Sequence, residues 1–237
     1  MMRILLVGIC LIAGSFLPPA ALAQPNAEKP DAAQLKEIQQ RHLQAAAKLQ
    51  KLYGHRVAIL KPGEDGVYNC YVHFSKGDIV NPGLPLLKDL FNVKHVYAAA
   101  ARFDDKGENV EVLGELSELE DLQFYLTGFG DNAAKAIAGL PKLKHVSVST
   151  TLITDSGVAE LARLPNLEYL SLTETRITDA SVPVLTEMKK LRGITVSKTQ
   201  ITPQAWAKFQ QAHPQVTERA YWDFNAGQVG GGVQGGR

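Results

Sequence analysis

The chain is poor in cysteine. Cys10 and Cys70 are the only two cysteines among its 237 residues. Because Cys10 lies in an N-terminal segment that we expect to be removed, Cys70 would be the single thiol of the mature protein, and no disulfide can form within it. Such a thiol forms an intermolecular bridge, acts as a nucleophile or, most often, packs as a small hydrophobic side chain.

The sequence also lacks an excess of charge and the common catalytic motifs. Lys and Arg number 25 against 24 Asp and Glu, and no basic cluster is present. This balance argues against a nucleic-acid partner. The motifs His-Glu-x-x-His, Gly-x-Ser-x-Gly and Cys-x-x-Cys and a phosphate-binding loop are also missing from the sequence. We therefore expect no enzyme and no cofactor.

The only long apolar run lies at the N-terminus. Arg3 precedes an apolar stretch over residues 4–16, and Ala21-Leu22-Ala23 forms a small-x-small cleavage site. The run is too short to span a bilayer comfortably. Residues 1–23 are therefore predicted to be a signal peptide, which implies a secreted or periplasmic protein with no membrane insertion after the signal is removed.

Residues 24–66 are predicted to form a linker, a helix and a hairpin that cap the fold. A helix is expected over 31–53, ended by Gly54, and a hairpin over 56–60 and 67–74. Docking of a partner is the alternative role for this helix. At the other end, residues 220–237 are expected to form an arm, in which Trp222 and Phe224 either seal the last rung or lie loose, followed by a disordered Gly-rich tail. The apolar stripe of the helix consists of Leu35, Ile38, Ala45, Ala46, Leu49, Leu52 and Tyr53.

Between these ends the sequence repeats with a period of about 24 residues. The copy from Leu164 to Asp179 has the form Leu-Pro-x-Leu-x-x-Leu-x-Leu-x-x-Thr-x-Ile-Thr-Asp. The same slots are filled one period earlier by Leu140, Leu143, Val146, Val148, Thr151 and Ile153, and one period later by Met188, Leu191, Ile194, Val196, Thr199 and Ile201. Further upstream they are filled by Leu116, Leu119, Leu122, Phe124, Thr127, Phe129 and Asp131, then by Val93, Val96, Ala98, Phe103, Asp105 and Gly107, and first by Val72, Phe74, Ile79, Asn81, Gly83 and Leu84.

This period and core pattern resemble those of leucine-rich repeat proteins, and in particular the repeats of exported bacterial proteins. The resemblance implies an α/β solenoid over residues 67–219, with about six rungs, a parallel sheet on the concave side and short helices on the convex side. One rung cannot bury its own apolar face, so stability has to come from stacked neighbours. The motif residues are structural and do not identify a partner.

Two polar slots of the repeat have structural interpretations. Thr178-Asp179 is predicted to open a helix, with Thr as the N-cap and Asp in the first turn. The preceding Thr slot is expected to form hydrogen bonds between adjacent turns, as Asn ladders do in related repeats. That column consists of Thr127, Thr151, Thr175 and Thr199.

The strand residues between the core slots should face solvent on the concave side. They include aromatic and polar side chains with little Lys or Glu, a composition that favours recognition of a protein partner. Glycan or cell-wall binding is the alternative, and an ordinary Ser/Thr-rich surface is the simplest one. The candidate residues are Tyr71, His73, His95, Tyr97, Asp121, Gln123, Tyr125, His145 and Tyr169.

One column of this face is more specific. His95, Asp121 and His145 should stand on successive rungs, so that one carboxylate can contact two imidazoles. The outer histidines would be separated by two rungs, about 9 to 10 Å, which strains a shared metal ion. We therefore expect a hydrogen-bonded surface cluster and no metal.

Overall fold

The computed structural model describes residues 32–62 and 68–216. The predicted signal peptide, the tip of the hairpin, and the arm with Trp222 and Phe224 lie outside these residues. One seven-stranded sheet runs through the molecule in the order β1-β2-β3-β4-β5-β6-β7. Its strands are β1 (Ala58–Pro62), β2 (Tyr68–Phe74), β3 (Val93–Ala99), β4 (Asp121–Tyr125), β5 (His145–Ser147), β6 (Tyr169–Ser171) and β7 (Gly193–Thr195).

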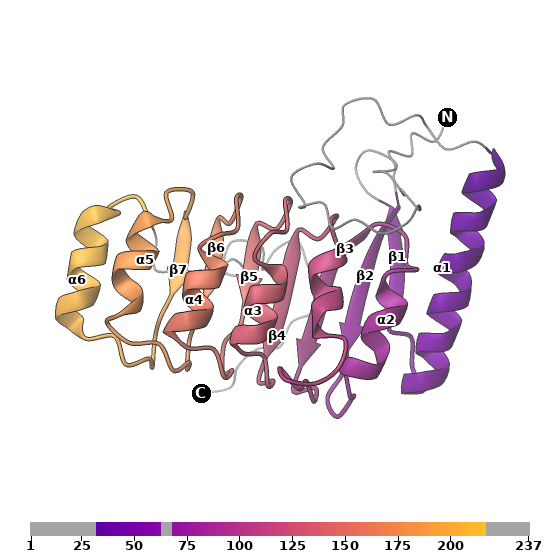
Figure 1. Ribbon diagram of the computed structural model, residues 1–237, viewed down its shortest axis with the longest axis horizontal. Coiled ribbons are helices and arrows are strands. Elements are labelled where there is room, and N and C mark those ends of the chain that lie inside the picture. The colour runs from indigo at the N-terminus through magenta and orange to yellow at the C-terminus, as the bar shows by residue number, and fades with distance from the viewer. Residues whose placement is uncertain (1–31, 63–67, 217–237) are drawn as a thin grey trace, which may run out of the picture.

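The sheet is parallel except at its first strand. β1 pairs antiparallel with β2, and each later strand pairs parallel with the one before it. Short helices cover one face of the sheet, as Figure 1 shows. They are η2 (Asn81–Gly83), α2 (Leu84–Leu87), η3 (Val110–Glu115), α3 (Asp131–Ile137), α4 (Asp155–Leu161), α5 (Ser181–Glu187) and α6 (Pro203–Ala212), and the longer α1 (Ala32–Tyr53) precedes them. The α/β leucine-rich repeat solenoid is therefore confirmed.

The core lies between the sheet and these helices. In the rung of β6, Leu170, Leu172 and Ile177 are at most 2% exposed, as the repeat predicts. The first rung departs from the prediction at one slot. Ile79, expected to be the apolar anchor, is 53% exposed, whereas the side chain of Val80 is fully buried. The predicted position of this apolar anchor was therefore wrong by one residue.

The threonine column does not connect neighbouring rungs, so the predicted ladder is wrong. The hydroxyls of Thr151, Thr175 and Thr199 each donate to the carbonyl three residues earlier in the same rung, at 2.5 to 2.7 Å. Thr127 instead accepts a hydrogen bond from the backbone N–H of Phe129. These threonines therefore brace the turn that ends each strand.

Neighbouring rungs are joined by the acidic slot instead. The Asp155 carboxylate accepts hydrogen bonds from the backbone N–H of Thr178, at 2.8 Å, and from its hydroxyl, at 2.7 Å. Asp131 contacts Thr154 in the same way, and Asp179 contacts Thr202. We call this column, which starts with Asn81 and Asp105, the aspartate ladder. It was predicted only as a set of helix starts.

The first two members of the ladder cross to the next rung with other partners. Asn81 bonds the backbone N–H and carbonyl of Asp104. Asp105 accepts from the backbone N–H groups of Gly130, Asn132 and Ala133, and so caps the start of α3. The ladder therefore extends through the degenerate rungs at the N-terminal end.

Helix α1 covers the N-terminal end of the solenoid. Its residues Ala45 and Leu49 are buried, as the stripe predicts, but Leu52 is 50% exposed. His42, which was not part of the predicted stripe, is buried and accepts a hydrogen bond from the backbone N–H of Phe91. The hydroxyl of Tyr53 donates to the carbonyl of Ile79 at 2.9 Å. Among the described residues no helix is both long and apolar enough to cross a membrane.

We predict that removal of one ladder carboxylate destabilises the solenoid. Asp155→Ala should lower the free energy of unfolding at pH 7 by about 2 to 3 kcal/mol, because hydrogen bonds to a charged acceptor are lost. Denaturant unfolding measures this loss. Glu187→Ala removes a carboxylate that is 80% exposed and should change stability by less than about 0.5 kcal/mol. Equal losses would contradict the ladder.

The same variant has a defined pH dependence. Burial opposes ionisation of Asp155, but the hydrogen bonds donated by Ser181 and Thr178 outweigh it and lower its pKa below 3.8. A carboxyl whose pKa is depressed by folding stabilises the fold above its unfolded pKa, and the contribution is lost as the pH falls through the folded value. The difference between wild type and variant should therefore shrink below about pH 4.

Candidate functional site

The candidate residues lie on the face of the sheet turned away from the helices, which we call the concave face. The parallel register places His95 opposite Asp121, and Asp121 opposite His145. His73 pairs with Tyr97 across β2 and β3. The remaining candidates follow from the same register: Tyr71 beside His95, Gln123 beside Tyr97, Tyr125 beside Ala99, and Tyr169 beside His145.

Rings of the N-terminal strands contact one another across this face. The His73 ring lies 5.5 Å from the rings of both His95 and Tyr97, centroid to centroid, and Tyr71 lies 5.7 Å from His95. The Lys61 amino group stands 4.8 Å above the centroid of the Tyr71 ring, a cation–π contact. These contacts make one continuous aromatic surface over β2 and β3.

Asp121 lies between two imidazoles, as the sequence predicts. Its Oδ2 atom is 3.4 Å from Nδ1 of His95 and 4.0 Å from Nδ1 of His145. The Gln123 side-chain amide donates to both carboxylate oxygens, at 3.0 and 3.1 Å. Across residues 32–62 and 68–216, no three His, Cys, Asp or Glu residues form a group that could hold a metal ion.

Burial keeps two of the histidines neutral at physiological pH. Desolvation, assisted by the nearby His95 and Lys61, lowers the pKa of His73 to about 4. Desolvation also lowers the pKa of His145, although Asp121 opposes this shift. With His73 uncharged, the contacting rings of Tyr71, His73 and Tyr97 make up much of the concave face over β2 and β3.

The C-terminal part of the concave face differs from the prediction. Ser147, Ser149 and Ser171 were expected to face solvent, but they are at most 8% exposed. The Ser171 hydroxyl is 2.8 Å from that of Ser149 and 2.6 Å from that of Thr195. The hydroxyl of Thr173 donates to the same Thr195 atom. Because these hydroxyl groups form hydrogen bonds with one another, fewer of them are available to bind a partner.

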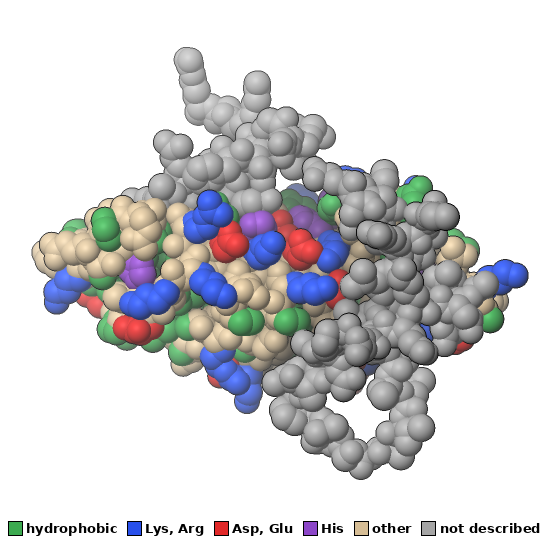
Figure 2. Space-filling model, turned by 90° about the horizontal axis from the view of Figure 1, so that it is seen from above, with side chains coloured by type: hydrophobic (Ala, Val, Ile, Leu, Met, Phe, Trp, Pro, Cys, Tyr) green, Lys and Arg blue, Asp and Glu red, His purple; other side chains and the backbone are tan. Residues whose placement is uncertain are grey.

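The edge at which the parallel strands begin carries charges of alternating sign. Lys94 bonds Glu118 at 3.2 Å and Glu120 at 2.7 Å, and Lys142 bonds the same Glu118 at 2.6 Å. Figure 2, which looks down on this edge, shows basic and acidic side chains gathered beside histidine. No prediction from the sequence covers this network, although its charges recur with the repeat. Because the charges are paired across rungs, we interpret the network as structural.

Cys70, on β2, is fully buried in the core. Burial raises the pKa of its thiol to about 12, against a small opposing effect of a hydrogen bond with the Ile59 backbone. A thiol that stays protonated and inaccessible is neither a nucleophile nor a partner for a disulfide. Of the three roles considered, packing as a small hydrophobic side chain is the one that fits.

No protein-family model matches the sequence, and a comparison with curated proteins finds no match. Solved structures with a TM-score of 0.42 include the mouse RP105/MD-1 complex, at 18% identity, and an internalin from Listeria monocytogenes, at 15%. A plant ice-binding protein has the same score at 15% identity. The alignments cover 55%, 63% and 73% of this protein and 22%, 47% and 60% of those proteins. Likeness at this level is too low to indicate a partner.

We predict a loss of stability in mild acid that depends on His73. The folded state holds this imidazole neutral down to a pKa of about 4, against 6.5 for an ordinary histidine. The unfolded state therefore binds more protons between these values, and stability falls as the pH drops from 6.5 to 4. Urea unfolding across this range should show a smaller loss for His73→Gln than for the wild type. Tyr71→Phe is the control, since it keeps the histidine; a similar flattening there would contradict this origin of the pH dependence.

Proposed function

We propose that this protein is an exported, non-enzymatic binding module that engages a protein partner through the N-terminal part of its concave face. The observation that carries this proposal is the continuous aromatic and histidine surface over β2 and β3, with the exposed Tyr125 on the next strand. Tyr and His side chains offer a large contact area at low cost in conformational entropy. Burial keeps the His73 imidazole neutral, so a partner does not have to desolvate a charge at that side chain.

The exposure of the tyrosines supports a contact surface on this side. The Tyr125 side chain is 48% exposed on β4. Tyr97 and His95, on the neighbouring strand β3, are half-buried. Solvent-accessible aromatic side chains next to half-buried ones form the pattern of an interface centre, where a few residues supply most of the binding energy.

A glycan ligand is the second candidate. The paired polar groups of Asp121 and Gln123 are two residues apart on β4, and Tyr125 follows them on the same strand. This arrangement offers hydrogen bonds to hydroxyl groups beside an exposed ring. Binding to a glycan array in the absence of any protein ligand would favour this candidate.

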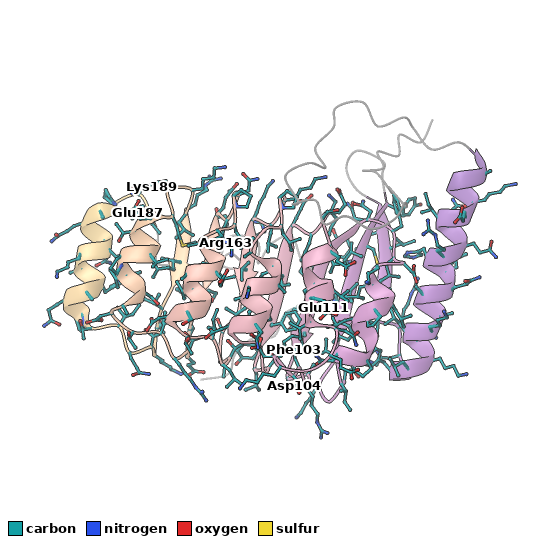
Figure 3. All side chains as sticks on the ribbon, viewed as in Figure 1. Phe103, Asp104, Glu111, Arg163, Glu187 and Lys189 are labelled. Carbon is teal, nitrogen blue, oxygen red and sulfur yellow. The ribbon has the colours of Figure 1, made fainter. Side chains whose placement is uncertain are left out.

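Tyrosine substitutions test the concave face directly. For a protein partner recovered by pull-down with the exported protein, Tyr97→Ala combined with Tyr125→Ala should weaken binding by more than about 2 kcal/mol, the scale of aromatic hot spots. Calorimetry measures the affinity, and thermal unfolding should stay nearly unchanged. Lys189→Ala, near the end of α5 (Figure 3), is the control and should have little effect.

One outcome would move the site elsewhere. If the tyrosine pair is silent while deletion of residues 31–53 abolishes binding, the concave face is not the interface and α1 is the docking element. Since α1 also covers the end of the core, the deletion variant must first be shown to keep its secondary structure by circular dichroism.

Export is tested by the mass of the protein recovered outside the cytoplasm. The proposed signal peptide implies a mature N-terminus at Gln24, and the buried Cys70 implies one free thiol after unfolding. Intact-mass spectrometry with and without alkylation in denaturant should show both. A retained N-terminus or a lipid on Cys10 would contradict the proposed export route.

A further inference from the structure

The sheet ends at β7, whose outer edge has no strand beside it among the described residues. Figure 1 shows β7 at the opposite end of the molecule from α1. An open edge presents unpaired backbone groups, which are a template for another strand. The edge strand at the other end, β1, contains Lys61 and ends in Pro62, residue types that are typical of protected edges. β7 contains neither lysine nor proline.

Two backbone N–H groups of the last rung are in position to bond a further strand. The N–H groups of Leu172 and Glu174 donate to carbonyls of the next rung at 2.8 and 2.9 Å. Val196 and Lys198 hold the corresponding positions one rung later, and neither N–H has an acceptor within the described part of the chain. The backbone turns in the same way at Lys198 as at Glu174, with φ of 56° and 57°. The two N–H groups therefore point away from β6, toward the open edge.

After α6 the chain repeats the turn with which earlier rungs enter their strands. The sequence at 213–216, His-Pro-Gln-Val, has the form of the Leu-Pro-x-Leu motif. The Val216 N–H donates to the His213 carbonyl at 3.0 Å, as Leu191 does to Met188 at 3.1 Å before β7. His213 is buried, and Val216 packs partly buried against the core. Because β7 begins two residues after its turn, the repeat places the start of a further strand at about residue 218.

The sequence that follows Val216 suits a strand. Residues 217–224 read Thr-Glu-Arg-Ala-Tyr-Trp-Asp-Phe, without glycine or proline, and Thr, Tyr, Trp and Phe are enriched in strands. Ala220, Trp222 and Phe224 recur at every second position, the period of a strand with one buried face. The segment is longer than β7, which has three residues, so it can cover the whole edge.

We propose that residues 217–224 form a further strand, parallel to β7, which closes the open edge of the sheet. Carbonyl groups of this segment accept hydrogen bonds from the Val196 and Lys198 N–H groups, and its alternate apolar side chains cover the last rung of the core. The occupant is this chain's own segment because it follows Val216 directly, so that pairing requires no long loop to be ordered. The proposal concerns the end of the solenoid and does not rest on the concave-face function.

Amide hydrogen exchange of the ¹⁵N-labelled full-length protein tests this pairing by NMR. The amides of Val196 and Lys198 should exchange as slowly as those of Leu172 and Glu174, within about tenfold, because all four are then hydrogen-bonded in the sheet. Nuclear Overhauser effects from the Val196 amide proton to residues 217–224 should identify the paired segment without any substitution.

A pair of prolines in the segment should open the edge. Ala220→Pro combined with Tyr221→Pro changes two adjacent residues, so one proline replaces an N–H that faces β7 in either register. Exchange of the Val196 and Lys198 amides should become at least about tenfold faster, because their hydrogen bonds are lost. The Leu172 amide should keep its slow exchange, which shows that the rest of the solenoid remains folded.

The matched control is Gln228→Pro combined with Val229→Pro, which places the same two prolines in the glycine-rich sequence and should leave both amides protected. Fast exchange of the Val196 and Lys198 amides in the unsubstituted protein would overturn the proposal, as would equal effects of the two proline pairs. Protection that rises with protein concentration, together with a dimer in sedimentation, would assign the edge to a second copy of the chain and overturn it as well.

Discussion

The fold depends on one polar side chain in each rung, which forms hydrogen bonds with the next rung of the solenoid. Apolar stacking drives burial but does not specify how one rung is aligned on the next. The ladder carboxylates do, because each accepts hydrogen bonds from the backbone N–H and the hydroxyl of one threonine in the next rung. These hydrogen bonds lie at the point where each turn leaves the sheet and enters its helix. The ladder therefore fixes the register of strands and helices together. In the first rung Asn81 bonds the next rung through its side-chain amide. In the last rung Pro203 occupies the position of the ladder aspartate.

Because the ladder makes the rungs equivalent, the differences between rungs carry the functional chemistry. The C-terminal rungs place small hydroxyls on the concave face, and these bond one another. The N-terminal rungs place rings and imidazoles in the same column positions. These rings pack against one another and stay partly accessible, whereas the serines of the later rungs are buried. This contrast favours the side of β2 to β4 over the rest of the face.

Much of this architecture could be predicted from the sequence, because a 24-residue period states which residues become neighbours across rungs. The pairing of His95, Asp121 and His145 is an example, since it needs only the period and the alternation of a strand. The period does not state which polar atom reaches across. Side chains at both the threonine and the aspartate positions could form hydrogen bonds between rungs. Only the path of the backbone through the turn determines that the aspartates do so. Ile79 failed because adjacent isoleucine and valine residues satisfy the pattern equally well, and Val80 is the buried one. The longer rung after β3 and the glycine at position 128 depart from the repeat, so the period does not predict the surface that they form.

The turn that follows each parallel strand from β3 to β7 has the same strained backbone. Every rung from β3 to β7 leaves its strand through one residue with φ between 53° and 57°, and these residues are Ala100, Leu126, Thr150, Glu174 and Lys198. Glycine or asparagine would adopt this conformation with less strain. Glu174 offsets its strain by bonding Thr150 and Lys198, but Leu126 is exposed and has no such contact to compensate. Because the conformation recurs while the residue type changes, the repeat itself imposes this strain on whichever residue stands at the turn.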